Sequence, residues 1–496
     1  MSITFNLVPT TARASAVFVE QEAVNRDTGS AEIPHKMLAI GQFNTGKSPA
    51  VDAPQLILSK SDAWDRYGRG SMLATMVELM ITHGGGVPVY ALPVADAGAA
   101  AAATGTLDVT GTATASGTVA IYVGGTRVPI AVNIGQAAAT IATNIAAAIN
   151  ANLDLPVTAT AATGTVTLRV RWAGESGNQI LLELNRRADE ALPPGVGVAV
   201  TDIGEATAGA NDPSLTNALA NLGDTWFTEV ALPYLSADAI GAMEAAGVAR
   251  SEPGIKRMFV GFVGYTDTQA NYLAFLGSRN SEWTTTVPVH GSATPAYVIA
   301  ASTAAVFARR QQAQPGRPVK TLTLPGVIAG DTNGLTYDER NVVVLAGGSH
   351  TYNQEDGTVT IGDLCTTRTT DAVGAETEDW RFSIIIPNLQ FKIFALEQRF
   401  SSRPFDRAVV LADGAGRGPT YAVRPSTVKG YAIGLVDDWV LRGLSTDRDT
   451  IVAGVVAQIN GANPGRIDLL IPDVPSTGLR VLAAKVEWAF LVGGTN

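Results

Sequence analysis

The stretch TTTVPVHGSATPAYVIAASTAAVFARR, residues 284–310, contains the pattern on which the fold assignment depends. TTTVPVH is a short run with strand character, and Gly291 allows a sharp turn directly after it. Thr294 is expected to cap the long helix that follows, with Pro295 in its first position, where a missing N–H costs nothing. The stretch therefore predicts a strand, a tight turn and a long helix.

Two similar strand–helix pairs lie upstream of this stretch. TWFTEVALPYL (225–235) and KRMFVGFVGY (256–265) have strand character, whereas SADAIGAMEAAG (236–247), with Ser236 as cap, and TQANYLAFLGS (268–278) are typical of helices. Strands that alternate with helices of about a dozen residues predict a parallel sheet covered on both faces. The centre of the chain is therefore expected to be an α/β domain.

Length and composition exclude several classes of protein. A chain of 496 residues is too long for one core, so we expect several domains. A net charge of −10 argues against nucleic-acid binding, which needs clustered Lys and Arg. The sequence contains no run of about 18 apolar residues, so no membrane span is expected. The start, MSITFNLVPTT, is unlike a secretory signal. The single cysteine, Cys365, and four scattered histidines predict neither a disulfide nor a metal site.

The segments on either side of the central region predict further units. SMLATMVELMITH places Met72, Met76, Leu79 and Met80 on one helical face. Downstream, two hairpins with turns at 124–125 and 163–164 flank a helix with an isoleucine at every fourth position, which predicts a small ββαββ unit that closes near Leu184. The predicted domains are an N-terminal arm (1–35), a first part of the body (36–95), an inserted ββαββ domain (96–208), a central α/β domain (209–318), a C-terminal α+β domain (319–478) and a C-terminal arm strand (479–496).

The C-terminal α+β domain is expected to mix both kinds of element. We expect a long helix over 380–400, bent at Pro387, and another over 424–444, capped by Thr427. Five segments are predicted as strands: NVVVLAGG (341–348), TVTIGDLCTTRTT (358–370), TIVAGVVAQIN (450–460), RIDLLIP (466–472) and LRVLAAKVEWAFLV (479–492). A strand-prone tail of this kind must find a partner strand, because an unpaired apolar strand aggregates.

The segment GQFNTGKS, residues 41–48, fits the phosphate-loop pattern G-x-x-x-x-G-K-[ST]. Such a loop works because a helix begins at the lysine and points its N-terminus at the phosphates. Here Pro49 and Pro54 follow Ser48 closely and favour an extended exit. A nucleotide hydrolase that uses Lys47 is therefore an alternative, but the helix that should begin at this lysine is not predicted.

The segment around Ser292 resembles the nucleophile region of subtilisin-like proteases, in which Gly-x-Ser-Ala-Thr-Pro opens a helix. A nucleophilic serine needs a histidine base that is itself oriented by a carboxylate. His83 ends a helix-like run, whereas the family's histidine starts a helix, and His290 lies only two residues from Ser292. Protease activity is therefore a second alternative, although the local fold can still be similar.

The order of these segments resembles the contractile tail sheath proteins of Mu-like, long-tailed bacteriophages over nearly the whole chain. The resemblance rests on APQLILSKSDAWDRYGRGSMLATMVELM (53–80), HGSATPAYVIAASTAAVFARR (290–310), DLCTTRTTD (363–371), RIDLLIP (466–472) and LRVLAAKVEWAF (479–490). It implies a multidomain fold, α/β plus α+β, with a central subtilisin-like three-layer α/β domain that has no protease activity. It also implies the C-terminal α+β domain and extended terminal arms, and it gives the phosphate-loop match no role. The inserted ββαββ domain is where this sequence departs from the shortest sheath proteins.

The resemblance also implies what the protein does and with what it assembles. It implies a structural, non-enzymatic subunit without a cofactor, which forms stacked hexameric rings around a tail tube protein and contracts during genome ejection. The other implied partners are baseplate and tail terminator proteins, with no nucleic acid and no membrane insertion, in a virion tail assembled in the host cytoplasm. The implied arm strands contain Val17, Phe18, Val19, Val481, Leu482, Val486, Trp488 and Phe490. The candidate tube contact is the helix that carries Phe391, Lys392, Glu397 and Arg399, and packing of that helix inside its own domain is the alternative.

Overall fold

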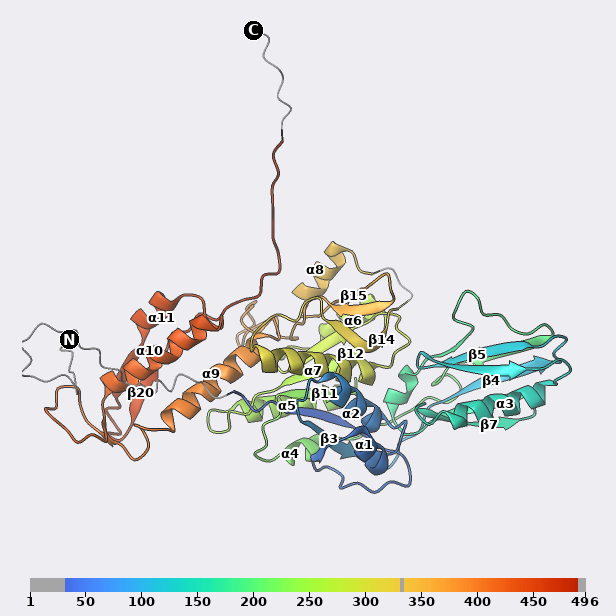
Figure 1. Ribbon diagram of the computed structural model, residues 1–496, viewed down its shortest axis with the longest axis horizontal. Coiled ribbons are helices and arrows are strands. Elements are labelled where there is room, and N and C mark those ends of the chain that lie inside the picture. The colour runs from blue at the N-terminus through green and yellow to red at the C-terminus, as the bar shows by residue number, and fades with distance from the viewer. Residues whose placement is uncertain (1–31, 331–333, 489–496) are drawn as a thin grey trace, which may run out of the picture.

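A computed structural model describes residues 32–330 and 334–488 of the chain. It shows a mixed α/β protein with an elongated arrangement of three regions (Figure 1). An inserted unit lies at one end of the long axis, a six-stranded sheet lies in the middle, and the helices near the C-terminus lie at the other end. The described part of the C-terminal tail leaves this arrangement without folding back on it.

The central sheet is parallel apart from one edge strand, and the two segments 36–95 and 209–318 both contribute to it. Its order is β13 (Thr284–Pro288), β12 (Val260–Tyr265), β11 (Glu229–Leu232), β1 (Met37–Gln42), β3 (Val89–Val94) and β2 (Gln55–Ile57), of which β2 alone runs antiparallel to its neighbour. The predicted alternation of strands and helices is therefore confirmed.

Helices cover both faces of this sheet. Gly261 and Gly264 lie three residues apart on β12, so they face opposite sides. A Cβ atom at Gly261 would come within 2.7 Å of the Met243 sulfur on α5, and one at Gly264 would lie 2.9 Å from Cβ of Ile299 on α7. The helices of this region are α1 (Lys60–Tyr67), α2 (Met72–His83), α4 (Thr216–Ala220), α5 (Ala237–Ser251), α6 (Gln269–Leu276) and α7 (Ala296–Ala313).

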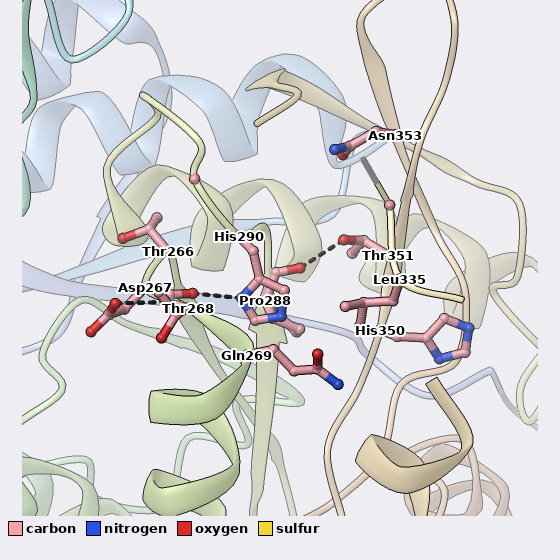
Figure 2. Close-up of a pocket in the computed structure, with 12 residues that line it drawn as sticks. Thr266, Asp267, Thr268, Gln269, Pro288, His290, Leu335, His350, Thr351 and Asn353 are labelled. Carbon is pink, nitrogen blue, oxygen red and sulfur yellow. Dashed lines mark hydrogen bonds between the residues drawn. The ribbon is translucent and has the colours of Figure 1, made fainter. Parts of the chain in front are cut away.

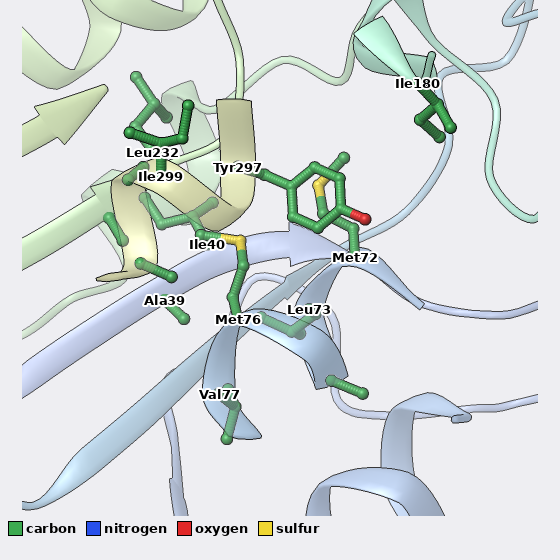
Figure 3. Packing of buried hydrophobic residues seen from close by; sticks show 14 of the residues in the cluster. Ala39, Ile40, Met72, Leu73, Met76, Val77, Ile180, Leu232, Tyr297 and Ile299 are labelled. Carbon is green, nitrogen blue, oxygen red and sulfur yellow. The ribbon is translucent and has the colours of Figure 1, made fainter. Parts of the chain in front are cut away.

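The predicted helical face on α2 forms part of the main core. Met72, Met76 and Met80 are fully buried, and Leu79 is partly buried. Figure 3 shows Met72 and Met76 next to Tyr297 of α7. Such flexible thioether side chains fill the irregular space between two helices and the sheet below.

The inserted unit is larger than the predicted ββαββ arrangement. Both hairpin turns form at the predicted positions, and Ile141, Ile145 and Ile149 form the buried face of α3. The unit does not close near Leu184, because a later strand, β10, pairs along β4. Its elements are β4 (Thr104–Gly111), β5 (Gly117–Val123), β6 (Thr126–Val132), α3 (Ala138–Ala151), β7 (Val157–Ala162), β8 (Thr165–Val170), the 3₁₀ helix η1 (Glu175–Gln179), β9 (Leu182–Leu184) and β10 (Val196–Thr201).

The C-terminal region combines a small sheet with a group of helices. The sheet has the order β14 (Thr323–Ile328), β16 (Thr358–Ile361) and β15 (Thr351–Asn353). A second apolar core lies between the helices and includes Phe391, Val436, Trp439 and Ile451. The remaining elements are α8 (Tyr337–Leu345), α9 (Ile385–Phe400), β17 (Val409–Val410), β18 (Ala422–Val423), α10 (Pro425–Leu441), α11 (Arg448–Gly454), β19 (Val456–Ile459) and β20 (Ile467–Leu470).

Two segments predicted as strands are helical. NVVVLAGG lies mostly in α8, because the Thr336 hydroxyl and the Glu339 carboxylate form a capping box that starts a helix before the run of valines. The first half of TIVAGVVAQIN lies in α11, which the Asp447 side chain caps, and only its second half forms β19. In both places a local cap overrides the strand preference of β-branched residues.

Four predicted helix caps and bends differ in detail. Pro387 lies in the first turn of α9 rather than in a bend, because a proline in that turn removes no intrahelical hydrogen bond. Helix α10 begins with Pro425, so Thr427 lies inside the helix and does not cap it. Helix α7 follows Pro295, and the Thr294 hydroxyl accepts instead from the backbone N–H of Ile328, 2.9 Å away. Ser236 precedes α5, but its side chain makes no capping hydrogen bond.

Candidate functional site

The segment that fits the phosphate-loop pattern has the wrong local structure for binding nucleotides. Gly41 lies within β1, and the residues after Ser48 form an irregular segment and a turn but no helix. The helix that follows begins only at Lys60, so no helix N-terminus faces Lys47. The Lys47 ammonium instead donates to the backbone carbonyl of Asp65, 2.9 Å away. The part of this segment that follows β1 therefore forms a surface turn.

Ser292 is buried and its hydroxyl proton is already committed. Its Oγ donates to the backbone carbonyl of Ile328 at 2.6 Å and accepts from the N–H of Thr294 at 3.0 Å. A hydroxyl has one proton, so this serine cannot also donate to a histidine base in the arrangement that a nucleophile requires. The hydroxyl thus fastens the turn before α7 to the strand β14.

A cavity of about 330 Å³ lies at the carboxyl ends of β12 and β13, where α/β sheets commonly hold ligands. Figure 2 shows His290 in this cavity, with its Nδ1 atom 2.5 Å from the backbone carbonyl of Asp267. Burial lowers the pKa of His290, so the ring is neutral near pH 7. Within residues 32–330 and 334–488, no three His, Cys, Asp or Glu side chains gather into a metal site.

The C-terminal tail is the largest exposed apolar segment in the described part of the chain. Val481, Leu482, Val486 and Trp488 are each at least 70 % exposed, and residues 479–488 form no regular secondary structure. From Leu482 onward apolar residues occupy every second position, while Lys485 and Glu487 pair with each other on the alternate positions. This alternation is typical of a strand with one face to bury.

Four of the predicted arm residues cannot be placed. Val17, Phe18, Val19 and Phe490 lie outside the described residues. The candidate N-terminal arm therefore stays a prediction, and Val481 to Trp488 are the part of the candidate arms that the structure describes.

A two-stranded sheet in the C-terminal region could accept an additional strand. β19 and β20 pair antiparallel, with Val456 opposite Leu470 and Ile459 opposite Ile467. Among the described residues no third strand pairs with either of them, so each has one open edge. Val456 and Leu470 are about half exposed. Open edges with exposed apolar side chains are the surfaces on which a strand from another chain can add.

Two of the four candidate tube-contact residues are buried within the subunit, which favours the alternative that this part of the helix packs inside its own domain. Phe391 and Lys392 on α9 are 2 % and 3 % exposed. The Lys392 ammonium donates to Asp473 at 2.6 Å and to the carbonyl of Leu444 at 3.0 Å. A cation buried in this way is compensated inside its own domain, although burial still lowers the pKa of Lys392.

The other two candidates lie nearer the surface of α9. Glu397 pairs with Lys256 at 3.2 Å, and the Arg399 guanidinium lies 4.1 Å from the ring centre of Tyr431. Both side chains remain candidates for the tube contact.

Sequence reasoning missed the residues that hold the tail to the body. Arg480 pairs with Asp363 and lies over the ring of Phe382, while Gly478 packs closely on Pro318. The only sequence signal was an arginine in an otherwise apolar run.

No helix of the described chain is long and apolar enough to span a membrane. No protein-family model matches the sequence. The sequence is 28 % identical to the Mu-like prophage FluMu tail sheath protein of Haemophilus influenzae, over 98 % of this chain and 100 % of that protein.

Solved structures of sheath proteins are also similar to this chain. The sheath tail protein of Desulfitobacterium hafniense aligns over 94 % of this chain and 97 % of its own, with 12 % identity and a TM-score of 0.49. The helical sheath of the anti-feeding prophage in its contracted state aligns over 96 % of this chain and 100 % of its own, with 12 % identity and a TM-score of 0.47. The full-length sequence relationship confirms the predicted resemblance: this chain is similar, from end to end, to a Mu-like phage tail sheath protein.

Proposed function

We propose that this chain is the structural subunit of a contractile phage tail sheath. It polymerises as stacked hexameric rings around a tail tube and contracts to drive the tube through the host envelope during genome ejection. The observation that carries the proposal is the 28 % identity to a Mu-like tail sheath protein over both full lengths. Its partners are further copies of itself, the tail tube protein, and baseplate and tail terminator proteins, and its place is the virion tail.

The exposed tail supplies the link between subunits in this proposal. Its apolar face, with Leu482, Val486 and Trp488, adds as a strand to the open β19–β20 edge of a neighbouring subunit. Burying each of these side chains contributes about 1.5–3 kcal/mol, which is offset in part by the ordering of the tail. Backbone hydrogen bonds fix the direction of the added strand, and the alternate side chains fix its register. A head-to-tail contact of this kind produces a helical assembly when it does not close into a ring.

Contraction in this proposal needs no nucleotide. The extended sheath is a kinetically trapped state, and contraction lets the folded bodies bury more surface against each other. Because about 25 cal/mol is gained for each Å² of apolar surface buried, a modest extra contact per subunit gives a large total over many copies. The Lys47 turn and the committed Ser292 hydroxyl support a role without hydrolysis.

Negative-stain electron microscopy of the purified chain, alone and co-expressed with its tube protein, tests the proposal. We expect hollow tubes or stacked rings in the absence of nucleotide. The matched control is a chain that ends at Arg480, which should stay folded and monomeric. Failure of the full-length chain to assemble around its tube protein would contradict the proposed function.

A further inference from the structure

The segment 473–480 runs from helices α10 and α11 to the part of the fold that contains the central sheet and the β14–β16–β15 sheet, which is called the body below. It first runs antiparallel to the α10–α11 connection, where Thr446 N–H donates to the Val474 carbonyl and Ser476 N–H donates to the Leu444 carbonyl, both at 3.0 Å. It then reaches Pro318, Asp363 and Phe382 on the body side. The chain therefore meets two different parts of the fold before the exposed tail begins.

The last contact on this path is made by Arg480. Its Nε atom lies 3.6 Å from Oδ1 of Asp363, and its guanidinium carbon lies over the ring of Phe382, 3.0 Å from the ring centre. The Arg480 side chain is 23 % exposed, whereas every described residue from Val481 onward is exposed. An ion pair combined with stacking on an aromatic ring holds a guanidinium in one orientation, which a lysine cannot reproduce.

A second observation shows that the approach to Arg480 is tightly constrained. A Cβ atom at Gly478 would collide with the Pro318 ring, so only glycine lets the chain lie this close to the body. Burial of Arg480 is strong enough to lower its pKa, which Asp363 opposes. Two contacts two residues apart therefore fix both the position and the direction of the chain at this point.

We propose that Arg480 is a positioning residue for the part of the C-terminal arm that begins at Val481: with Asp363, Phe382 and Gly478 it fixes the point and direction in which this part leaves the body. This rests on the proposed function, in which the arm must reach the edge of a neighbouring sheet. A strand held near its target has a higher effective concentration there and loses less conformational freedom on binding. Loss of the contact lets the arm search a wider volume.

The first test measures the arm in the free subunit and does not depend on assembly. Ala274→Cys on α6 and Ala483→Cys on the arm receive nitroxide spin labels, because the native Cys365 is buried and does not compete. Double electron–electron resonance then gives the distribution of distances between the labels. We expect the distribution to broaden in Arg480→Ala and in Asp363→Ala, and to stay unchanged in Lys485→Ala, which removes a charge beyond the contact. An unchanged width in Arg480→Ala would overturn the proposal.

Rescue separates positioning from a merely structural role. The charge swap Arg480→Asp with Asp363→Arg restores the ion pair and should narrow the distribution again, while Arg480→Lys keeps the charge but loses the stacking and should lie between. If the charge-swapped protein gave a distance distribution as broad as that of Arg480→Ala, the ion pair would not be what holds the arm.

The second test links the contact to assembly. In Arg480→Ala we expect the protein concentration needed for tube formation to rise about tenfold, with the thermal midpoint of the free subunit unchanged. Equal assembly of Arg480→Ala and the native chain, despite a broader distribution, would overturn positioning. Lack of assembly by the native chain would instead contradict the proposed function, and the spin-label result would still decide whether Arg480 holds the arm.

Discussion

The central sheet and the C-terminal arm are both rich in apolar residues, but the chain treats them in opposite ways. Every residue of β1, β11, β12 and β13 is buried within the subunit, whereas residues 481–488 are all exposed. An apolar strand that a chain leaves uncovered is either a liability or a contact site. The sheet therefore stabilises the subunit, and the arm leaves an apolar face uncovered, which in the proposed function a second copy covers.

The largest effect is expected from substitutions that remove the apolar face of the arm. Leu482→Asp with Val486→Asp places charges on the apolar face, which cannot be buried against a neighbour without a large desolvation cost. We expect tube formation to be abolished in a sedimentation assay while the thermal midpoint of the subunit is unchanged. Lys485→Ser with Glu487→Ser, on the opposite face, is the matched control and should assemble normally. If both double variants lost tube formation equally, the apolar face of the arm would not be the face that makes the contact.

The next effect acts on the sheet side. Gly264→Ala places a methyl group against the backbone of Ala296 and the side chain of Ile299, so we expect a loss of about 1–3 kcal/mol in the free energy of unfolding. The control, Gly241→Ala on α5, meets nothing within 4 Å and should be neutral or stabilising by about 0.5–1 kcal/mol. Urea denaturation measures both. If Gly264→Ala cost no more than Gly241→Ala, the close packing of α7 on β12 would be wrong.

A third, smaller effect is the loss of subunit stability at mildly acidic pH. It concerns the body and not the arm, because no histidine follows His350 in the sequence. Burial lowers the pKa of His350 below 6.5, Arg340 and Lys320 lower it further, and Asp363 opposes them. As the pH falls, His350 therefore binds its proton in the unfolded chain before it does so in the folded chain. The stability present above pH 6.5 is lost as the pH falls from that value through the lower pKa of the folded state. We expect the free energy of unfolding to fall between pH 7.5 and 5.5, and to fall less steeply in His350→Gln. An equal slope in the two proteins would exclude His350 as a cause.

The smallest effect concerns the two motifs that resemble enzyme sites. Lys47→Ala removes one hydrogen bond at the surface, and Ser292→Ala removes two inside the body, for which we expect a cost of about 1–2 kcal/mol in stability. Neither should change tube assembly measured by sedimentation. Loss of assembly in Lys47→Ala alone, with the subunit still folded, would revive a role for the loop.

Local signals predicted much of the fold. The alternation of strands and helices over 225–310 and the two-residue turn at Gly124 and Gly125, which both adopt positive φ, depend on neighbouring residues alone. The strand β10 escaped prediction because its pairing with β4 joins residues far apart in sequence. Helix α8 has a local signal, since Thr336 and Glu339 have the spacing of a capping box, but the strand preference of the three valines opposes it.

The candidate interface was predicted only in part for a related reason. Periodicity identifies the apolar face of the arm, because side chains alternate along any strand. It does not reveal which positions of α9 point inward, and there Phe391 and Lys392 proved to be buried. The contact between Arg480 and Asp363 joins residues more than a hundred positions apart, so no local pattern predicts it.

The most direct test of the account is disulfide cross-linking between subunits in assembled tubes. One population carries Val486→Cys on the arm, and the other carries a single cysteine at one of the positions of β19 or β20, Val456 to Ile459 or Ile467 to Leu470. We predict cross-linked dimers in mixed tubes at alternate hairpin positions, and none in unassembled protein at the same concentration. Tubes that form normally without a cross-link at any position would contradict the claim that the arm completes a neighbour's sheet.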